Sequence, residues 1–194
     1  MSTAPALRMT EAEYLEAERT ATERHEFLQG RCWAMSGGTL PHMRLQRNLV
    51  SLLGAALRGR PCEVITADLR IKSELTGLYT YPDASVVCGP MRFLDARQDT
   101  LLNPTVIFEV LSDSTEAYDR GEKFDHYRRI PSITDYLLVS QHKVQIEHFR
   151  RQPDGGWSLH ILGPGQHLEV AGARIAVDDV YLKVFQPPDS GEAG

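Results

Sequence analysis

The residues of this chain best suited to take part in a reaction are two acids, Asp83 and Glu109. Asp83 follows Pro82 and opens the strand-like segment ASVVC, whereas Glu109 lies within the strongly apolar segment TVIFEVLS. If these consecutive strands pair antiparallel, the start of the first lies beside the end of the second, which brings the two carboxylates together. Two like charges held close favour a hard divalent cation such as Mg²⁺. The pair therefore predicts a metal site, the alternative being that Pro82 and Asp83 only form a turn.

Glu109 stands out because its strand is otherwise apolar on both faces. Successive side chains of a strand alternate between faces, so Val106, Phe108 and Val110 share one face and Glu109 lies on the other. A strand that is apolar on both faces is expected to be central in its sheet and covered on both sides. Burying an unpaired charge is costly, so Glu109 needs a cation, a metal or a proton. The alternative is a glutamate near a strand end that is exposed or paired with an arginine.

A third group comes from the helix predicted over residues 115–130. Asp119, Lys123 and Tyr127 are spaced at i, i+4 and i+8, so they share one face of this helix. An Asp–Lys pair at this spacing is often no more than a weak surface ion pair. Lys123 follows the Glu109 strand after one short loop, however, so its amine can reach the carboxylates. A lysine at such a site can stabilise hydroxide and the extra charge of a phosphorane-like transition state.

These groups need strands and helices that bring them together. A capping box of Thr10 and Glu13 predicts a helix over about 11–20, and apolar residues at helical spacing predict a longer one over 42–57. Strands are expected on either side of Gln29 and Gly30, over 62–72, in ASVVC, after the long loop GPMRFLDARQDTLLN in TVIFEVLS, in DYLLVS, and in a C-terminal β meander through KVQIEHFRR, WSLHILG and ARIAVDDVYL. The order from residue 42 to 140 is helix, three strands, helix, strand. This order predicts an α/β fold, a mixed sheet with helices on its faces.

The length of 194 residues suits a single domain over 1–185, with a core over about 25–140 and a β extension over about 141–185. The segment 186–194, QPPDSGEAG, is expected to be disordered. Hydrophobic residues make up 42% of the chain, which is enough for a core, yet no segment is apolar for long enough to span a membrane. The N-terminal segment has no apolar signal core, so we expect a cytoplasmic protein.

The three cysteines, Cys32, Cys62 and Cys88, lie far apart and form no C-x-x-C pair. The odd count and the wide spacing argue against a disulfide framework and against a zinc ribbon. They therefore predict reduced, buried thiols.

The net charge of −5 does not by itself indicate a nucleic-acid-binding protein. The charge is nevertheless uneven, because the middle of the chain is basic and both ends are acidic. Lysines and arginines outnumber acids over 40–72 and again over 120–151. Solvated helix faces are one interpretation of this pattern, and a groove for a polyanion is the other.

Taken together, the motifs resemble the PD-(D/E)XK nuclease superfamily, and more closely a bacterial family of restriction endonuclease-like proteins that was long described as a domain of unknown function. The segments that carry the resemblance are EFLQGRCWAMSGGTLPH, YPDASVVC, PTVIFEVLSDST, DRGEKFDHY and IPSITDYLLV. They cover roughly residues 25–140. The chain departs from the superfamily pattern at Leu111, because the usual lysine lies two residues after the acid on the same strand. In the resembled family this lysine is shifted to the following helix, where it corresponds to Lys123.

The resemblance implies a restriction endonuclease-like core and metal-dependent hydrolysis of DNA phosphodiester bonds. Asp83 and Glu109 would hold Mg²⁺ or Mn²⁺, with the backbone carbonyl of Val110 as an extra ligand, and Lys123 would position or activate the attacking water. Glu26 corresponds to an acidic position near the N-terminus of such nucleases and would support the metal site, the alternative being a surface strand residue. A duplex substrate would fit a two-fold homodimer, in which each subunit cuts one strand.

Other residues are candidates for contacts with the substrate. His42 matches a recurrent histidine of the resembled family and would touch a phosphate or transfer a proton, the alternative being a structural histidine at a helix terminus. The further candidates for phosphate and substrate contacts are Arg44, Arg47, Arg70, Lys72 and Tyr127.

Two other functions fit the same sequence. The fold could serve as a binding or scaffold module without catalysis, which the absent lysine at position 111 and the acidic net charge favour. A hydrolase of another phosphate ester is the third possibility. Metal binding through Asp83 and Glu109 separates a nuclease from a scaffold, and a panel of substrates separates the two hydrolases.

Overall fold

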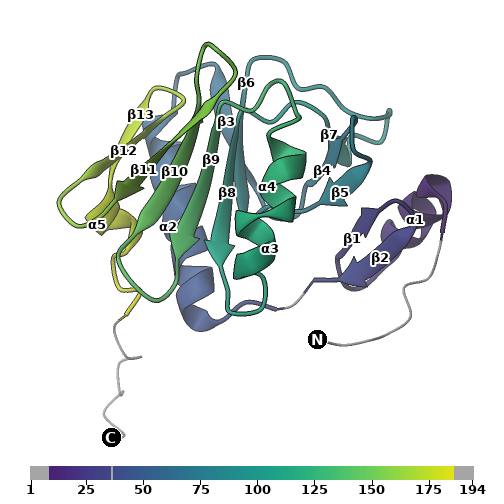
Figure 1. Cartoon of the computed structure of the whole chain (residues 1–194), viewed down its shortest axis with the longest axis horizontal. Helices are drawn as coiled ribbons and strands as arrows, with labels where there is room; N and C mark the ends of the chain where they lie inside the picture. Colours follow the sequence, from purple (N-terminus) through teal and green to yellow (C-terminus); the bar gives the residue numbers. More distant parts are fainter. Residues whose placement is uncertain (1–8, 36, 186–194) are drawn as a thin grey trace, which may run out of the picture.

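A six-stranded mixed sheet forms the centre of the molecule in the computed structural model, which describes residues 9–35 and 37–185 (Figure 1). The segment 186–194, for which disorder is predicted, lies outside the described residues. The strand order is β11-β10-β9-β8-β6-β3. In chain order these strands are β3 (Cys62–Thr66), β6 (Ala84–Cys88), β8 (Val106–Leu111), β9 (Asp135–Ser140), β10 (Ile146–Arg151) and β11 (Trp157–Leu162).

Strand β8 lies inside this sheet, as its two apolar faces predict. It pairs antiparallel with β6 and parallel with β9, and all six of its residues are buried. Helix α2 (Leu40–Ala56) covers one face, and α4 (Glu122–Tyr127) covers the other (Figure 1). Val106, Phe108 and Val110 pack toward α2. The α/β architecture with helices on both faces of a mixed sheet is thus confirmed.

Helix α2 has the local signals that a helix of this length needs. The side chain of Thr39 accepts a hydrogen bond from the His42 backbone N–H, and Pro41 occupies the first turn, where its missing N–H costs nothing. Buried Leu45, Leu49 and Leu53 lie one turn apart and face the sheet. The Thr39 cap therefore fixes the end of α2 that carries His42.

A second sheet has five strands in the order β2-β1-β5-β4-β7, and α1 (Glu11–Glu18) packs on it around Tyr14, Phe27 and Tyr79. The capping box of Thr10 and Glu13 is present. The predicted strand over 62–72 is confirmed as strand at both ends but is not continuous, because a turn after Thr66 ends β3 and the chain then crosses to β4 in the second sheet. Part of the predicted long loop also forms a strand. The five strands are β1 (His25–Leu28), β2 (Arg31–Ala34), β4 (Arg70–Ser73), β5 (Leu78–Thr80) and β7 (Thr100–Leu101).

The helix predicted over 115–130 is two short helices, α3 (Glu116–Arg120) and α4. They meet at Gly121, whose φ of −114° and ψ of −95° leave helical geometry at the residue where this costs least. The C-terminal meander contains β12 (His167–Val170) and β13 (Ala173–Ala176), but its last part is the helix α5 (Val177–Val180) rather than strand. No helix in the described ranges is long and apolar enough to cross a bilayer.

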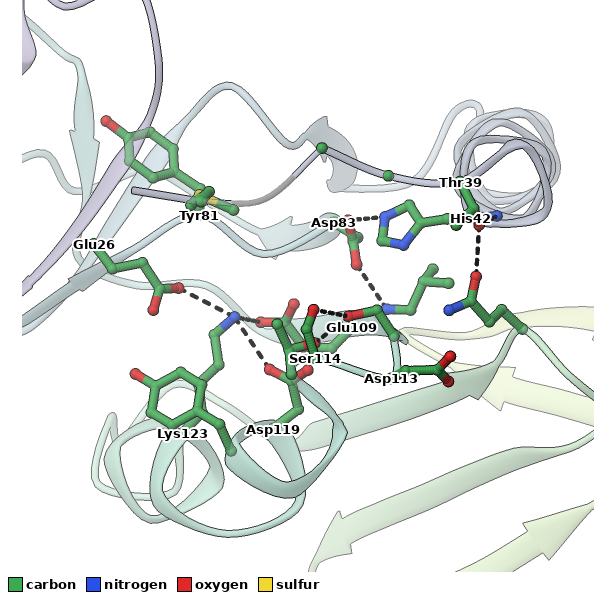
Figure 2. A pocket seen from close by; sticks show the side chains of 18 of the residues that line it. Glu26, Thr39, His42, Tyr81, Asp83, Glu109, Asp113, Ser114, Asp119 and Lys123 are labelled. Atoms are coloured by element: carbon green, nitrogen blue, oxygen red, sulfur yellow. Dashed lines mark hydrogen bonds and ion pairs between the residues drawn. The ribbon is translucent and has the colours of Figure 1, made fainter. Parts of the chain in front are cut away.

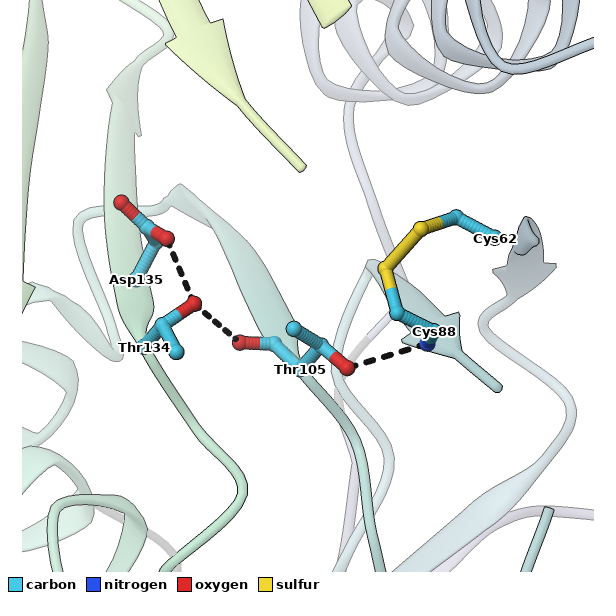
Figure 3. Close-up of a disulfide and its surroundings, with 5 residues drawn as sticks. All are labelled: Cys62, Cys88, Thr105, Thr134 and Asp135. Carbon is cyan, nitrogen blue, oxygen red and sulfur yellow. Dashed lines mark hydrogen bonds between the residues drawn. A yellow bond between two sulfur atoms is a disulfide. The ribbon is translucent and has the colours of Figure 1, made fainter. Parts of the chain in front are cut away.

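The expectation of three reduced cysteines is wrong for two of them, because Cys62 and Cys88 form a disulfide (Figure 3). The two residues face each other across the antiparallel β3–β6 ladder, with their Cα atoms 4.0 Å apart. Thr105 accepts a hydrogen bond from the Cys88 backbone N–H at the same point. Wide spacing in sequence does not exclude a bond between residues that pairing places opposite each other. Cys32 keeps a free, half-buried thiol.

Candidate active site

A pocket of about 480 Å³ lies where the two sheets and the start of α2 meet (Figure 2). Glu26 enters it from β1, Asp83 from the residue before β6, and Glu109 from β8. The structure thus brings together six of the residues that the sequence singles out: Glu26, His42, Asp83, Glu109, Val110 and Lys123.

Asp83 lies where the antiparallel pairing of β6 and β8 predicts. Ala84 pairs with Phe108, so the preceding Asp83 comes level with Glu109. One oxygen of Asp83, Oδ2, accepts a hydrogen bond of 2.7 Å from the Val110 backbone N–H. The other, Oδ1, lies 2.7 Å from His42 Nε2 (Figure 2). The backbone of β8 and the start of α2 therefore fix this carboxylate from two sides.

The ammonium of Lys123 lies among three carboxylates (Figure 2). Its Nζ is 2.9 Å from Glu109 Oε1, 3.2 Å from Glu26 Oε1 and 3.4 Å from Asp119 Oδ1. Lys123 is only 5% exposed, and each of the three acids is 3% exposed. The prediction that Asp119, Lys123 and Tyr127 share one face is confirmed, because all three are buried toward β8.

Hydrogen bonds from neutral groups fix the same carboxylates. The hydroxyl of Tyr127 donates to Glu109 Oε1 at 2.9 Å. Glu26 accepts from the Thr80 hydroxyl and, at 3.2 Å, from Trp33 Nε1. Glu26 is therefore a buried part of this cluster rather than a surface residue of its hairpin.

Burial and charge set the protonation of the cluster. Burial raises the pKa of Glu109 well above its usual range, against the opposing effect of Lys123. Burial likewise raises the pKa of Asp119, again opposed by Lys123. Burial acts to lower the pKa of Lys123, but the surrounding charges, Glu109 first and then Glu26, outweigh it and raise that pKa well above the usual value. Lys123 is therefore an ammonium at neutral pH.

Burial and a neighbouring charge also have opposite effects on the pKa of His42. Burial acts to lower the pKa of its imidazole, but the hydrogen bond and the charge of Asp83 raise that pKa overall. The Nδ1 atom of His42 is buried and has no hydrogen-bond partner among the described residues. His42 faces the pocket and contacts Asp83, so its imidazole lies where it can act at the site.

In the described part of the chain, no three His, Cys, Asp or Glu side chains are grouped closely enough to form a finished metal site. The donor atoms nevertheless suit a hard cation, because carboxylate oxygens are the ligands that Mg²⁺ and Mn²⁺ prefer. Asp119 Oδ1 is buried without a hydrogen bond, and its ion pair among the described residues is with Lys123. Three carboxyl groups contact the one ammonium, and Asp83 lies in the same pocket, so the site offers more carboxyl oxygens than Lys123 alone can bind.

Five of the predicted substrate contacts lie outside the pocket lining: Arg44, Arg47, Arg70, Lys72 and Tyr127. Arg70 cannot meet a phosphate, because it is 3% exposed and its guanidinium binds Thr100 and Tyr81 inside the second sheet. Lys72 pairs with Glu11 on that sheet. Arg44 lies on α2 outside the pocket lining and donates to the Val184 carbonyl. Tyr127 is fully buried and contacts Glu109, so it supports the carboxylate without reaching the pocket.

Sequence reasoning gave Asp119 no role at the site and did not single out two aromatic residues of the pocket, Trp33 and Tyr118. Asp119 carried a signal, because it shares the helix face of Lys123, but a surface ion pair at that spacing is the commoner outcome. Trp33 and Tyr118 line the pocket with aromatic rings 6.3 Å apart in an edge-to-face arrangement. They come from β2 and α3, and nothing local in the sequence relates these two elements.

A mixed sheet that presents an aspartate before one strand, a glutamate in the next and a lysine from the following helix defines a nuclease-like fold. The chain belongs to the Uma2 family, whose model matches residues 11–177 and is described as "Putative restriction endonuclease".

Similarities to known sequences and to a solved structure are consistent with membership in this family. Two proteins of Synechocystis sp., both named as uncharacterized, are similar to the chain. One is 38% identical over 181 residues, which is 92% of this chain and 94% of the relative. The other is 36% identical over 168 residues, which is 86% of this chain and 95% of the relative. The crystal structure of a "putative nuclease belonging to DUF820" from Anabaena variabilis matches the fold with a TM-score of 0.73 at 16% identity, covering 91% of this chain and 99% of that one.

Proposed function

We propose that this protein is a metal-dependent endonuclease that hydrolyses phosphodiester bonds of DNA. The observation that carries the proposal is the convergence of Asp83, Glu109 and Lys123 in one pocket of a nuclease-like fold. Family membership supports it, because the family model is described as a restriction endonuclease family.

Asp83 and Glu109 are the residues that would hold Mg²⁺ or Mn²⁺, with the Val110 carbonyl as a further ligand, and Glu26 would support the site through Lys123. The buried Asp119 carboxylate, 3.4 Å from Lys123, is a candidate for the same role. When bound, the cation would supply positive charge beside the phosphate and acidify water. Asp83 and Glu109 can bind a cation while they keep their present hydrogen bonds, because each carboxylate oxygen can accept more than one contact.

Lys123 acts as a charged donor rather than as a base. Its raised pKa keeps the amine protonated, so it orients water or phosphate and stabilises the negative charge that develops during hydrolysis. Tyr127 positions Glu109 through its hydrogen bond, and Glu26 positions Lys123 through their ion pair. His42, hydrogen-bonded to Asp83, is the group at the pocket that can carry a proton near neutral pH.

DNA as the partner and a homodimeric assembly are parts of the same proposal, whereas the cytoplasmic location stays an expectation from the sequence. DNA follows from the nuclease-like fold, and a two-fold dimer would supply two cutting sites. The Cys62–Cys88 disulfide is evidence against a cytoplasmic location, since such bonds persist mainly in oxidising surroundings.

The test is cleavage of circular DNA, double-stranded and single-stranded, by the purified protein with Mg²⁺ or Mn²⁺. Asp83→Asn and Glu109→Gln should each lower the rate about a hundredfold or more, because each removes a carboxylate that would hold the cation beside the reacting phosphate. Glu63→Gln is the matched control, since Glu63 is an exposed acid of β3 outside the pocket. Circular dichroism and melting temperature confirm that the variants are folded.

One observation favours binding without hydrolysis: Lys123 already neutralises part of the carboxylate cluster. Calorimetric titration with Mn²⁺ decides between the two functions. Binding that Asp83→Asn and Glu109→Gln abolish supports the nuclease. No binding, together with no cleavage of either DNA, supports the scaffold.

A further inference from the structure

The carboxylates of the candidate site lie at the floor of the pocket rather than on an open surface. Glu109 is 3% and Lys123 is 5% exposed. A DNA duplex is stiff, with a persistence length of about 50 nm, so pushing its backbone into a deep pocket requires distortion. A single strand is flexible and enters such a pocket more easily.

The wall of this pocket is aromatic. Trp33 and Tyr118 are both partly exposed and meet edge to face. The hydrogen bond from Trp33 Nε1 to Glu26 Oε2 holds the indole at the rim of the carboxylate cluster. Aromatic side chains beside a nucleic-acid groove bind unpaired bases by stacking, and this works for every base because each has a π-face.

The same two aromatic residues also line a second pocket of about 280 Å³, together with Leu28, Arg31 and Glu122. Trp33 and Tyr118 therefore separate two adjoining hollows. Arg31 is exposed, and no ion pair joins it to another described residue. In the larger pocket, by contrast, Lys123 is the only lysine or arginine among the described lining residues. The smaller pocket thus supplies a free guanidinium that the larger one lacks.

From these features we infer that the substrate is unpaired DNA. Its nucleotides on the two sides of the cut occupy the two pockets, a base stacks on the indole of Trp33 with Tyr118 edge-on beside it, and Arg31 binds a phosphate in the smaller pocket. This inference rests on the proposed nuclease function and replaces the intact duplex expected from the sequence. The larger pocket then holds the scissile phosphate over Asp83 and Glu109.

The test measures binding to a single-stranded oligonucleotide and to the same sequence as a duplex, with Ca²⁺ in place of Mg²⁺. The chain has two tryptophans, so in a Trp157→Phe variant the fluorescence reports on Trp33 alone. We expect the single strand to quench this signal and to bind at least about tenfold more tightly than the duplex. Equal or tighter binding of the duplex, or an unchanged Trp33 signal, overturns the inference.

Two pairs of variants locate the contacts. Trp33→Ala should weaken binding of the single strand about tenfold, whereas Trp33→Phe keeps a stacking surface and most of the affinity. Arg31→Gln should weaken binding and reduce the salt dependence by about one phosphate contact. Arg58→Gln is its control, because Arg58 is also exposed and lines neither pocket.

The outcomes separate this inference from the proposed function. Cleavage of double-stranded plasmid as fast as single-stranded circular DNA keeps the nuclease and rejects the unpaired substrate. Cleavage of the single-stranded circle alone supports both. Absence of metal binding and of cleavage rejects the nuclease, whatever the oligonucleotide affinities are.

Discussion

The ammonium of Lys123 lies 2.9 Å from Glu109 Oε1, and both groups are almost wholly buried. Helix α4 thus brings to Glu109 an amine that β8 itself does not supply, because the residue two positions after Glu109 is Leu111. Leu111 packs into the core beneath α4. The geometry of the site depends on where the amine lies and not on which element carries it.

Loss of the Lys123 charge should destabilise the fold strongly. In Lys123→Met the three neighbouring acids, Glu26, Glu109 and Asp119, lose their cation, and breaking a buried pair of this kind costs about 3–5 kcal/mol. Urea unfolding of the metal-free protein measures the loss. Adding Glu109→Gln to Lys123→Met should restore part of the stability, because one unpaired carboxylate is gone. Strictly additive losses would show that the pair does not interact.

The His42–Asp83 contact should make stability depend on pH. The pKa of folded His42 is raised above the usual value of 6.5, so the protonated imidazole stabilises the fold. This contribution is fully present below about pH 6.5 and is lost as the pH rises through the folded pKa. The free energy of unfolding without metal, measured from pH 6 upward, should therefore fall more for the wild type than for His42→Gln.

An NMR titration of His42 checks the cause of the same shift. In Asp83→Asn the carboxylate that does most to raise the pKa of His42 is gone, and burial, which lowers that pKa, is opposed only by the charge of Asp119. The midpoint of the His42 titration should move to lower pH. A midpoint that stays in place would assign the shift to another neighbour.

The disulfide between Cys62 and Cys88 should stabilise the protein. It closes a loop with a sequence separation of 26 residues, and bonds of this kind contribute about 2–4 kcal/mol. Reduction with dithiothreitol should lower the melting temperature of the wild type but not that of a Cys62→Ser/Cys88→Ser variant. Thiol titration of the denatured, unreduced protein should find one thiol, that of Cys32. Three reactive thiols would mean that the bond does not form.

The assembly is the simplest prediction to check. A homodimer should give, by light scattering, twice the chain mass of 21.8 kDa. A single chain mass over the whole range of concentrations would refute the dimer. The same measurement with metal and an oligonucleotide shows whether the substrate drives the association.

Several features of this protein could be read from the sequence because they depend on neighbours along the chain. The Thr10 capping box, the alternation around Glu109 and the four-residue spacing of Asp119 and Lys123 are local patterns. The approach of Asp83 to Glu109 also follows from the sequence, since consecutive antiparallel strands place the start of one beside the end of the next.

Only the tertiary structure decided how distant elements meet. The second sheet brings Glu26 to Lys123 and buries Arg70 among aromatic rings, away from any phosphate. Strand register places Cys62 opposite Cys88, and the packing of β2 against α3 joins Trp33 to Tyr118. Each of these contacts joins segments that share no local period, so the charge, depth and aromatic wall of the pocket arise from packing between elements rather than from any stretch of sequence.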